Sequence, residues 1–420
     1  MNEVVGHQHA ELQRSLRGEE EENMNYREFH FKTLTPIWTG GAGRNSDRPR
    51  ETGIIGSLRW WYEGIVRALG GAVCDATADD ASKRCIFEQK RGETFHDAYM
   101  RLCPACRLFG CTGWRRRFRL EIAGLEPQDL FFVASSGVYV AAGNWLWRMF
   151  GGEELGGTRS DRNAGVTFTF GAQTLWGEQA TLRVVPLGDD QEGTLARVAF
   201  LLDTVARWGA LGAKPQHGFG QVQITAGLEP DEVEEGRRLV RTDAESKPGK
   251  SGPNFFNLDR FFSHTYRLAQ PEPYLGTTRE IGMPPRGFDY RQHFIPCAFD
   301  IRYKSRSRDF HTGAGQDFGM RPRFRQKWGQ QVAHRLFGRS DARRDQDRAA
   351  GRIHVSHLYR IEPDGPWHLK VWGHVPSNLR DNQGKMISVD DVAGQVTAFV
   401  EAMFPGSELV EQFSREEVLG

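Results

Sequence analysis

The sequence predicts an α+β fold made of two related modules, each built from short strands and helices. The chain has 420 residues, which is more than one hydrophobic core usually holds. Apolar residues alternate in some segments, as in strands, and recur every three or four residues in others, as in helices. The tetrapeptide RLFG occurs at residues 107–110 and again at 335–338, and a strand-like segment with arginine follows each copy. The length and this repeat together favour a duplicated βα module.

The first module is organised around an amphipathic helix within residues 51–71. Apolar side chains share one face of it at helical spacing: Leu58, Trp61, Tyr62, Ile65 and Leu69. Ser57 can cap its first turn. A strand over residues 28–38 precedes the helix, with Phe29 and Phe31 on one face. The unit is therefore strand, loop and helix.

The loop between that strand and helix is rich in glycine and arginine, with Arg44, Arg48 and Arg50 in it. Unpaired backbone N–H groups collect at the start of a helix, and glycines let the backbone approach a phosphate closely. The loop is therefore a candidate phosphate site. A solvated loop of an ordinary βα unit has the same composition, so that alternative stays open.

The remaining elements and the domain bounds follow from the same patterns. Strands are expected at residues 115–122, 166–170, 181–185, 297–304, 352–361 and 367–375, and helices at 192–211, 325–337 and 390–404. Residues 1–25 are polar without an apolar period, which predicts a disordered leader. The predicted domains cover residues 26–228 and 257–420. A linker rich in charge, proline, glycine and serine joins them over 229–256.

Charge is segregated along the chain, although the net charge is only +1. Acidic residues gather at 10–28 and 226–245, whereas arginine gathers at 44–50, 115–119, 302–308 and 321–327. Arginine outnumbers lysine several-fold, which suits forked contacts to phosphate, although a GC-rich genome gives the same excess. The sequence shows neither a long apolar run nor an apolar signal region, so we expect a cytoplasmic protein.

Four of the six cysteines form a candidate zinc site. Cys103 and Cys106 make a CxxC knuckle, and Cys74 with Cys85 supply two more thiolates for a tetrahedral ion. Such a site has four protein ligands and would be structural. A redox pair and buried, inert cysteines are the alternatives, because the first pair is spaced more widely than usual.

A glycine turn near residue 218 combines backbone freedom with an aromatic side chain. Gly218, Phe219 and Gly220 follow Lys214, and they could lay backbone and an aromatic ring against RNA. A plain hairpin turn explains the same residues.

The second half contains a further basic segment. Arg302, Lys304 and Arg306 alternate along the end of an expected strand and so share one face. Arg321 and Arg323 follow in a stretch that mixes glycine and aromatic residues. Charge holds a phosphate backbone while aromatic rings stack on bases, as single-stranded RNA binding requires. A solvated charged face is the alternative.

Five stretches together resemble the RAMP superfamily of CRISPR proteins, and within it the first-numbered RAMP subunits of type III-B Cmr effector complexes. They are FKTLTPIWTGG, ETGIIGSLRWWYE, LCPACRLFGCTGW, the GFG turn and RIHVSHLYRI. The resemblance implies two tandem ferredoxin-like domains of βαββαβ order, similar to RNA-recognition domains. It also implies membership in a multisubunit ribonucleoprotein with crRNA, target RNA and other Cmr-module subunits as partners.

On this resemblance we expect a noncatalytic RNA-binding subunit at the guide 3′ end, which aids guide–target pairing in antiviral defence. Its expected RNA contacts are the basic and aromatic residues named above, joined by two from the helix, Arg59 and Trp60. One alternative is a metal-independent endoribonuclease that processes guide precursors, with His217 or His293 as general acid or base. Another is an architectural protein that contacts only other subunits.

Overall fold

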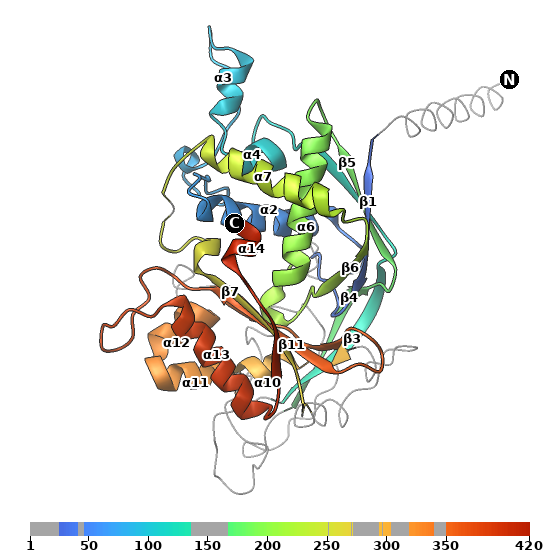
Figure 1. Ribbon diagram of the computed structural model, residues 1–420, viewed down its shortest axis with the longest axis vertical. Helices are drawn as coiled ribbons and strands as arrows, with labels where there is room; N and C mark the ends of the chain where they lie inside the picture. Colours follow the sequence, from blue (N-terminus) through green and yellow to red (C-terminus); the bar gives the residue numbers. More distant parts are fainter. Residues whose placement is uncertain are drawn as a thin grey trace, which may run out of the picture.

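The computed structural model describes residues 25–40, 46–135, 167–250, 252–269, 271, 294–295, 297–303, 319–339 and 350–420. Apart from its last residue, the predicted leader lies outside them. The α+β expectation is confirmed, because helices cover antiparallel sheets (Figure 1). Among the described residues, no helix is both long and apolar enough to cross a bilayer.

The first module is a four-stranded antiparallel sheet with helices α2 (Glu51–Ala68) and α6 (Gln191–Trp208) against it (Figure 1). In sheet order the strands are β2 (Phe118–Ala123), β5 (Ala180–Pro186), β1 (Arg27–Thr33) and β6 (Val222–Ala226). Phe29 and Phe31 of β1 point into the core, as their alternation predicts. Helix α2 buries the five apolar side chains of its predicted face, Leu69 only partly. It begins at Glu51, nearly two turns before the predicted cap at Ser57.

Insertions extend this module. A hairpin of β3 (Glu126–Ser135) and β4 (Thr167–Trp176) leaves the sheet, and the short helices α3 (Phe95–Met100) and α4 (Pro104–Phe109) lie between α2 and β2. Three short 3-10 turns are present: η1 (Ala81–Lys83), η2 (Pro215–His217) and η3 (Leu258–Arg260).

The second module has its own antiparallel sheet and core. Its strands, in sheet order, are β12 (Glu408–Gln412), β7 (Phe261–Arg267), β11 (Trp367–His374), β10 (Leu358–Arg360) and β8 (Phe294–Ile295), and β9 (Ile353–Val355) also pairs with β11. Its helices are α10 (Ala298–Tyr303), α11 (Met320–Trp328), α12 (Gln330–Phe337), α13 (Val389–Met403) and α14 (Arg415–Leu419).

Both sheets follow one order. In the first module β1 and β5 lie in the middle, flanked by β2 and β6; in the second, β7 and β11 lie in the middle, flanked by β10 and β12. With the hairpin β3–β4 and the short strands β8 and β9 left out, the first and third strands of each module are thus central. A helix separates the first strand from the second and the third from the fourth. This order agrees with the ferredoxin-like arrangement that the resemblance implies.

The RLFG repeat occupies equivalent places in the two modules. Each copy ends a helix, α4 or α12, at a glycine with nearly the same backbone: Gly110 at φ 84° and ψ 164°, Gly338 at φ 87° and ψ 165°. In each copy the leucine carbonyl accepts a backbone hydrogen bond from the start of the next strand, 2.9 Å from Arg117 and 2.7 Å from Arg352. Because φ values near 85° favour glycine, the glycine of each RLFG copy allows its helix to end in the same way. It therefore supports the predicted duplication.

Two predicted segments have a different structure. Helix α7 (Pro230–Glu245) fills the first half of the stretch expected as a linker, and it packs along α6. Gly236 makes this contact close, since a Cβ there would lie 2.0 Å from the Ala196 carbonyl oxygen. Residues 297–304 were expected as a strand, but Ala298–Tyr303 forms α10. The domain bounds themselves stay a prediction.

The two modules share an apolar interface. Trp61 of α2 lies edge-on to Phe261 at 5.3 Å between ring centroids and against Trp372 at 5.5 Å. Lys370 of β11 crosses the interface and donates from Nζ to the carbonyl oxygens of Ala206 (3.2 Å) and Arg207 (2.6 Å) at the end of α6. Helices α2 and α6 of the first module therefore contact strands β7 and β11 of the second, and residues of both modules line the cavity between them.

Candidate functional site

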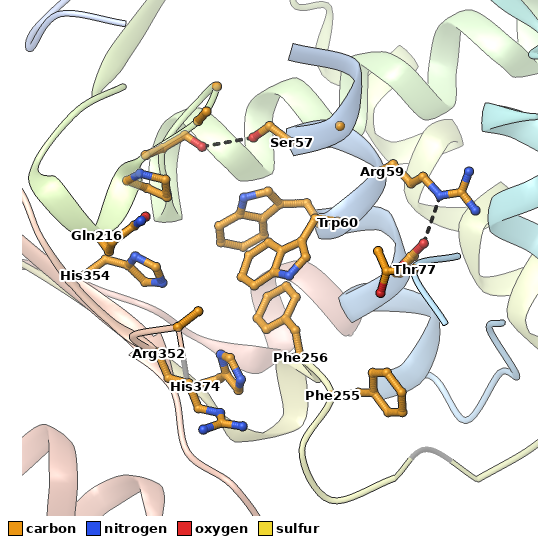
Figure 2. Close-up of a pocket in the computed structure, with 18 of the residues that line it drawn as sticks. Ser57, Arg59, Trp60, Thr77, Gln216, Phe255, Phe256, Arg352, His354 and His374 are labelled. Atoms are coloured by element: carbon orange, nitrogen blue, oxygen red, sulfur yellow. Dashed lines mark hydrogen bonds and ion pairs between the residues drawn. The ribbon is translucent and has the colours of Figure 1, made fainter. Parts of the chain in front are cut away.

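A cavity of about 870 Å³ opens between the two modules. One wall is the solvent-facing side of α2 with Gly56 and Trp60, together with the segment around Pro215. The opposite wall comes from the second sheet, with Arg352, His354 and His374 (Figure 2). A space of this size holds a nucleotide-sized ligand, and pockets between domains are common places for one.

Stacked aromatic rings form the centre of the cavity. The indole of Trp60 lies on the ring of Phe256 with centroids 3.7 Å apart and planes 3° from parallel (Figure 2). On the second sheet, the His354 ring stacks on Trp372 at 3.9 Å. Such rings are rigid apolar surfaces on which a base can stack.

Polar groups without partners face this aromatic centre. The Nδ1 atom of His354 and both ring nitrogens of His374 are buried and make no hydrogen bond. Burial lowers the pKa of His374 to about 3 and that of His354 well below its ordinary value, and Arg352 and Arg302, respectively, add to the shifts. Both rings are therefore neutral at pH 7, and their unbonded nitrogens are potential hydrogen-bonding groups beside the cavity.

The four predicted zinc cysteines lie together. Cys74, Cys85, Cys103 and Cys106 have sulfur atoms within 4.8 Å of one another. The Sγ atom of Cys74 is 3.5 Å from that of Cys106 and 3.7 Å from that of Cys103. Zinc–sulfur bonds of about 2.3 Å in a tetrahedron place sulfurs about 3.8 Å apart, so the thiols fit a zinc ion. The cluster holds the loop after α2 against α4.

A second set of contacts surrounds the cysteines. The backbone N–H of Cys103 donates to Cys85 Sγ at 3.3 Å, and Arg59 Nη2 donates to Cys106 Sγ at 3.2 Å. Arg59 also donates to the Gly110 carbonyl and to Glu63, both at 2.9 Å. Donors of this kind stabilise thiolate charge and orient metal ligands. Arg59, predicted to contact RNA, therefore holds the cysteine cluster while its stem lines the cavity.

The first predicted RNA loop is only partly described. Arg44 lies outside the described residues, and Arg48 is exposed. Arg50 pairs with Asp47 at 2.9 Å. Trp60 is the one member of this predicted group whose ring lies at the centre of the cavity.

The glycine turn is structural. Gly218 and Gly220 adopt φ of 98° and 86°, and a Cβ on Gly220 would lie 2.2 Å from the Leu211 carbonyl oxygen. Phe219 is fully buried between Trp38 and His357, so its ring is not exposed to solvent. Its burial joins the two modules. Lys214 lies beside the turn, with its ammonium group 3.4 Å from the Trp38 ring centroid.

The predicted basic face of the second half does not form as expected. Arg302 is 1% exposed and donates to the carbonyls of Gln216 (2.6 Å) and Phe337 (3.1 Å), so it joins the modules from within. Lys304 and Arg306 lie outside the described residues. Arg321 and Arg323 are on α11, half-buried, and the Arg323 guanidinium lies over the Phe399 ring. The alternation argument assumed a strand and fails because residues 298–303 are helical.

Sequence reasoning missed Gly56, Phe256, Arg352 and His374 as parts of the cavity. Arg352 belongs to the RIHVSHLYRI stretch, but its role depends on sheet pairing between residues far apart in the chain. Gly56 carried a local signal, because a glycine inside a predicted helix often marks close approach of another group.

One family model matches part of the chain. Residues 30–223 match the model of the RAMP superfamily. Among curated proteins, none matches the chain.

Solved structures show more distant likeness. The crystal structure of apo Cmr1 from Pyrococcus furiosus has 13% identity and a TM-score of 0.40, covering 92% of this chain and 98% of that one. A cryo-electron microscopy structure of type III-B Cmr-beta, bound to cognate target RNA and AMPPnP in the presence of ssDNA, has 11% identity and a TM-score of 0.40, covering 91% and 100%. A type IV-B CRISPR complex has 16% identity and a TM-score of 0.28, covering 48% and 91%.

Proposed function

We propose that the chain is a noncatalytic RNA-binding subunit of a type III-B CRISPR (Cmr) interference ribonucleoprotein. In this role it holds crRNA and target RNA near the guide 3′ end and aids their pairing, beside other Cmr-module subunits. The RAMP match over residues 30–223 and the five sequence motifs support the family role. The observation that carries RNA binding is the cavity between the modules.

The cavity has the features that a single RNA strand needs. The partly exposed ring of Trp60, backed by the buried ring of Phe256, offers a surface for a base, and two neutral histidines lie beside it. Arg352 supplies positive charge beside them. Exposed Arg48 and partly exposed Lys214, Arg321 and Arg323 remain candidates for phosphate contacts outside the cavity.

The placement of His217 supports a noncatalytic role. This residue was the candidate acid–base group of the endoribonuclease alternative. It is 5% exposed, and burial, with Arg302 nearby, lowers its pKa well below the ordinary value. A proton-transfer group must reach its substrate, and His217 lies inside the module interface. His293 lies outside the described residues.

We also propose that the four cysteines bind a structural zinc ion. Around them the loop of residues 72–94 contains few buried apolar side chains, so the ion would supply much of the energy that folds it.

A steric variant tests the RNA proposal. Gly56 lines the cavity from α2, and a Cβ added there meets no atom within 4 Å, so Gly56→Leu fills space without disturbing the fold. Gly394→Leu is the matched control, because Gly394 is another exposed helical glycine with equally open space. We expect fluorescence anisotropy with single-stranded RNA to show weaker binding for Gly56→Leu only, and affinity that falls with salt. Equal affinities for both variants and the parent protein would remove the cavity from the proposal.

A further inference from the structure

Three neighbouring arginines, of which Arg352 lines the cavity, lack the anions that arginine usually binds. We call Arg260, Arg335 and Arg352 the arginine corner. Arg352 donates only to backbone carbonyls, those of Arg335 at 2.9 Å and Asn254 at 3.4 Å. Arg335 donates to Asn378 and, at 3.5 Å, to Asn254.

Arg260 is the least satisfied member of the corner. Its side chain donates no hydrogen bond, and its Nη1 atom is buried. In the part of the chain that the structure describes, none of the three arginines forms an ion pair. Its neighbour Asp259 pairs with Arg415 at 2.7 Å instead.

The charges of Arg335 and Arg260 disfavour the charged form of Arg352. Burial lowers the pKa of each guanidinium below its ordinary value, and for Arg352 the charges of Arg335 and Arg260 lower it further. Arg197, in contrast, is a buried arginine whose pKa is raised despite burial, because Asp243 bonds to it at 2.7 Å. Arg197 therefore has the carboxylate partner that the three arginines of the corner lack.

The corner adjoins the aromatic centre. His374 lies between them, with its ring 5.3 Å from that of Phe256, and Arg352, Arg260 and Arg67 all act on its charge. Figure 2 shows Arg352 and His374 together, on the side of the cavity away from Arg59. A ligand whose flat ring stacks on Trp60 would thus bring an attached anion to Arg352, the member of the corner that lines the cavity.

We propose that the arginine corner binds the terminal phosphomonoester of a nucleotide whose base stacks in the cavity. This inference rests on the proposed function and specifies that a strand end, not an internal nucleotide, occupies the cavity. A phosphomonoester carries about −1.5 to −2 charge and three free oxygens, whereas an internal diester carries about −1 and two. Three guanidiniums without carboxylates match the monoester in charge and in number of acceptors.

Oligonucleotides that differ only at their ends test this proposal. The same eight-nucleotide RNA is prepared with a 3′-phosphate, with a 5′-phosphate or with hydroxyls at both ends, and affinities are measured by anisotropy. We expect one phosphorylated form to bind about tenfold tighter than the hydroxyl form, because it gains at least one charge-assisted contact. The phosphorylated RNA that binds more tightly identifies which end of the strand enters the cavity.

Arg260→Met should abolish this preference, and the exposed Arg380→Met should retain it. Arg260→Met removes no hydrogen bond, so a melting curve like that of the parent is expected. Equal affinity for all three RNAs in the parent protein would overturn the phosphomonoester site and leave RNA binding intact. If the chain bound none of the RNAs, the proposed function would fail. Calorimetry with a nucleoside monophosphate would then test the phosphomonoester site independently of RNA binding. Binding by the parent protein that is lost in Arg260→Met would support the site, and no binding by the parent protein would overturn it.

Discussion

Replacing Arg59 should weaken zinc binding rather than act on RNA alone. Its guanidinium makes three contacts: the Glu63 carboxylate, the Gly110 carbonyl and Cys106 Sγ. Arg67 offers a close control, because it also bonds Glu63, at 3.1 Å, and one carbonyl, that of Phe256 at 3.2 Å. The two arginines therefore differ chiefly in the contact to the thiol.

The expected magnitudes follow from these contacts. Arg59→Met and Arg67→Met each leave one buried carbonyl without its donor and remove one bond to Glu63, which costs about 1–3 kcal/mol of unfolding free energy. Only Arg59→Met also removes a donor to a sulfur of the proposed zinc site. Loss of such an outer contact lowers metal affinity about 10–100-fold.

Competition with a chromophoric chelator measures zinc affinity, and urea unfolding measures stability. We expect similar stability losses for the two variants and a loss of zinc affinity in Arg59→Met alone. If both variants held zinc equally well, the contact between Arg59 and Cys106 would have no role in metal binding.

Three further predictions concern stability. Burial lowers the pKa of both His357 and His374 to about 3. Below pH 6.5 the unfolded chain binds protons at these two side chains and the folded chain does not, so the free energy of unfolding should fall as the pH drops from 6.5 towards 3. At pH 5 the expected loss is about 2 kcal/mol per histidine. Urea midpoints at pH 7.5 and 5 measure this, and equal midpoints would contradict it. Lys370→Met should cost about 1–3 kcal/mol, because two carbonyls at the end of α6 lose their donor, and an unchanged melting temperature would refute that contact. Cys103→Ser should lose zinc by metal analysis and expose residues 72–94 to protease, while the rest of the chain stays folded; full retention of one zinc per chain would exclude the site.

Local patterns predicted the elements that local forces determine. The apolar face of α2, the alternation in β1 and the RLFG helix ends all depend on neighbours within a few residues. The cysteine cluster could also be predicted, because the CxxC spacing of Cys103 and Cys106 is typical of zinc sites. Helix α7 was missed because only Gly236, Val240 and Ala244 are buried on it, which is a sparse apolar stripe.

The cavity could not be predicted, because its walls come from two modules. Arg302 resembles a phosphate ligand in sequence, yet its partners are carbonyls of Gln216 and Phe337, far from it along the chain. Phe219 resembles a stacking residue, yet the module interface buries it. Charge and aromatic content indicate RNA binding, but only long-range packing decides which of these side chains reach solvent.

Crosslinking tests the central claim most directly. RNA carrying 4-thiouridine is bound to the protein and irradiated, and the crosslinked peptides are identified by mass spectrometry. The account predicts crosslinks in the α2 segment containing Gly56 and Trp60 and in the second-sheet segments containing Arg352 and His374. Crosslinks confined to other surfaces, with both of these walls unmodified, would contradict an RNA site between the two modules.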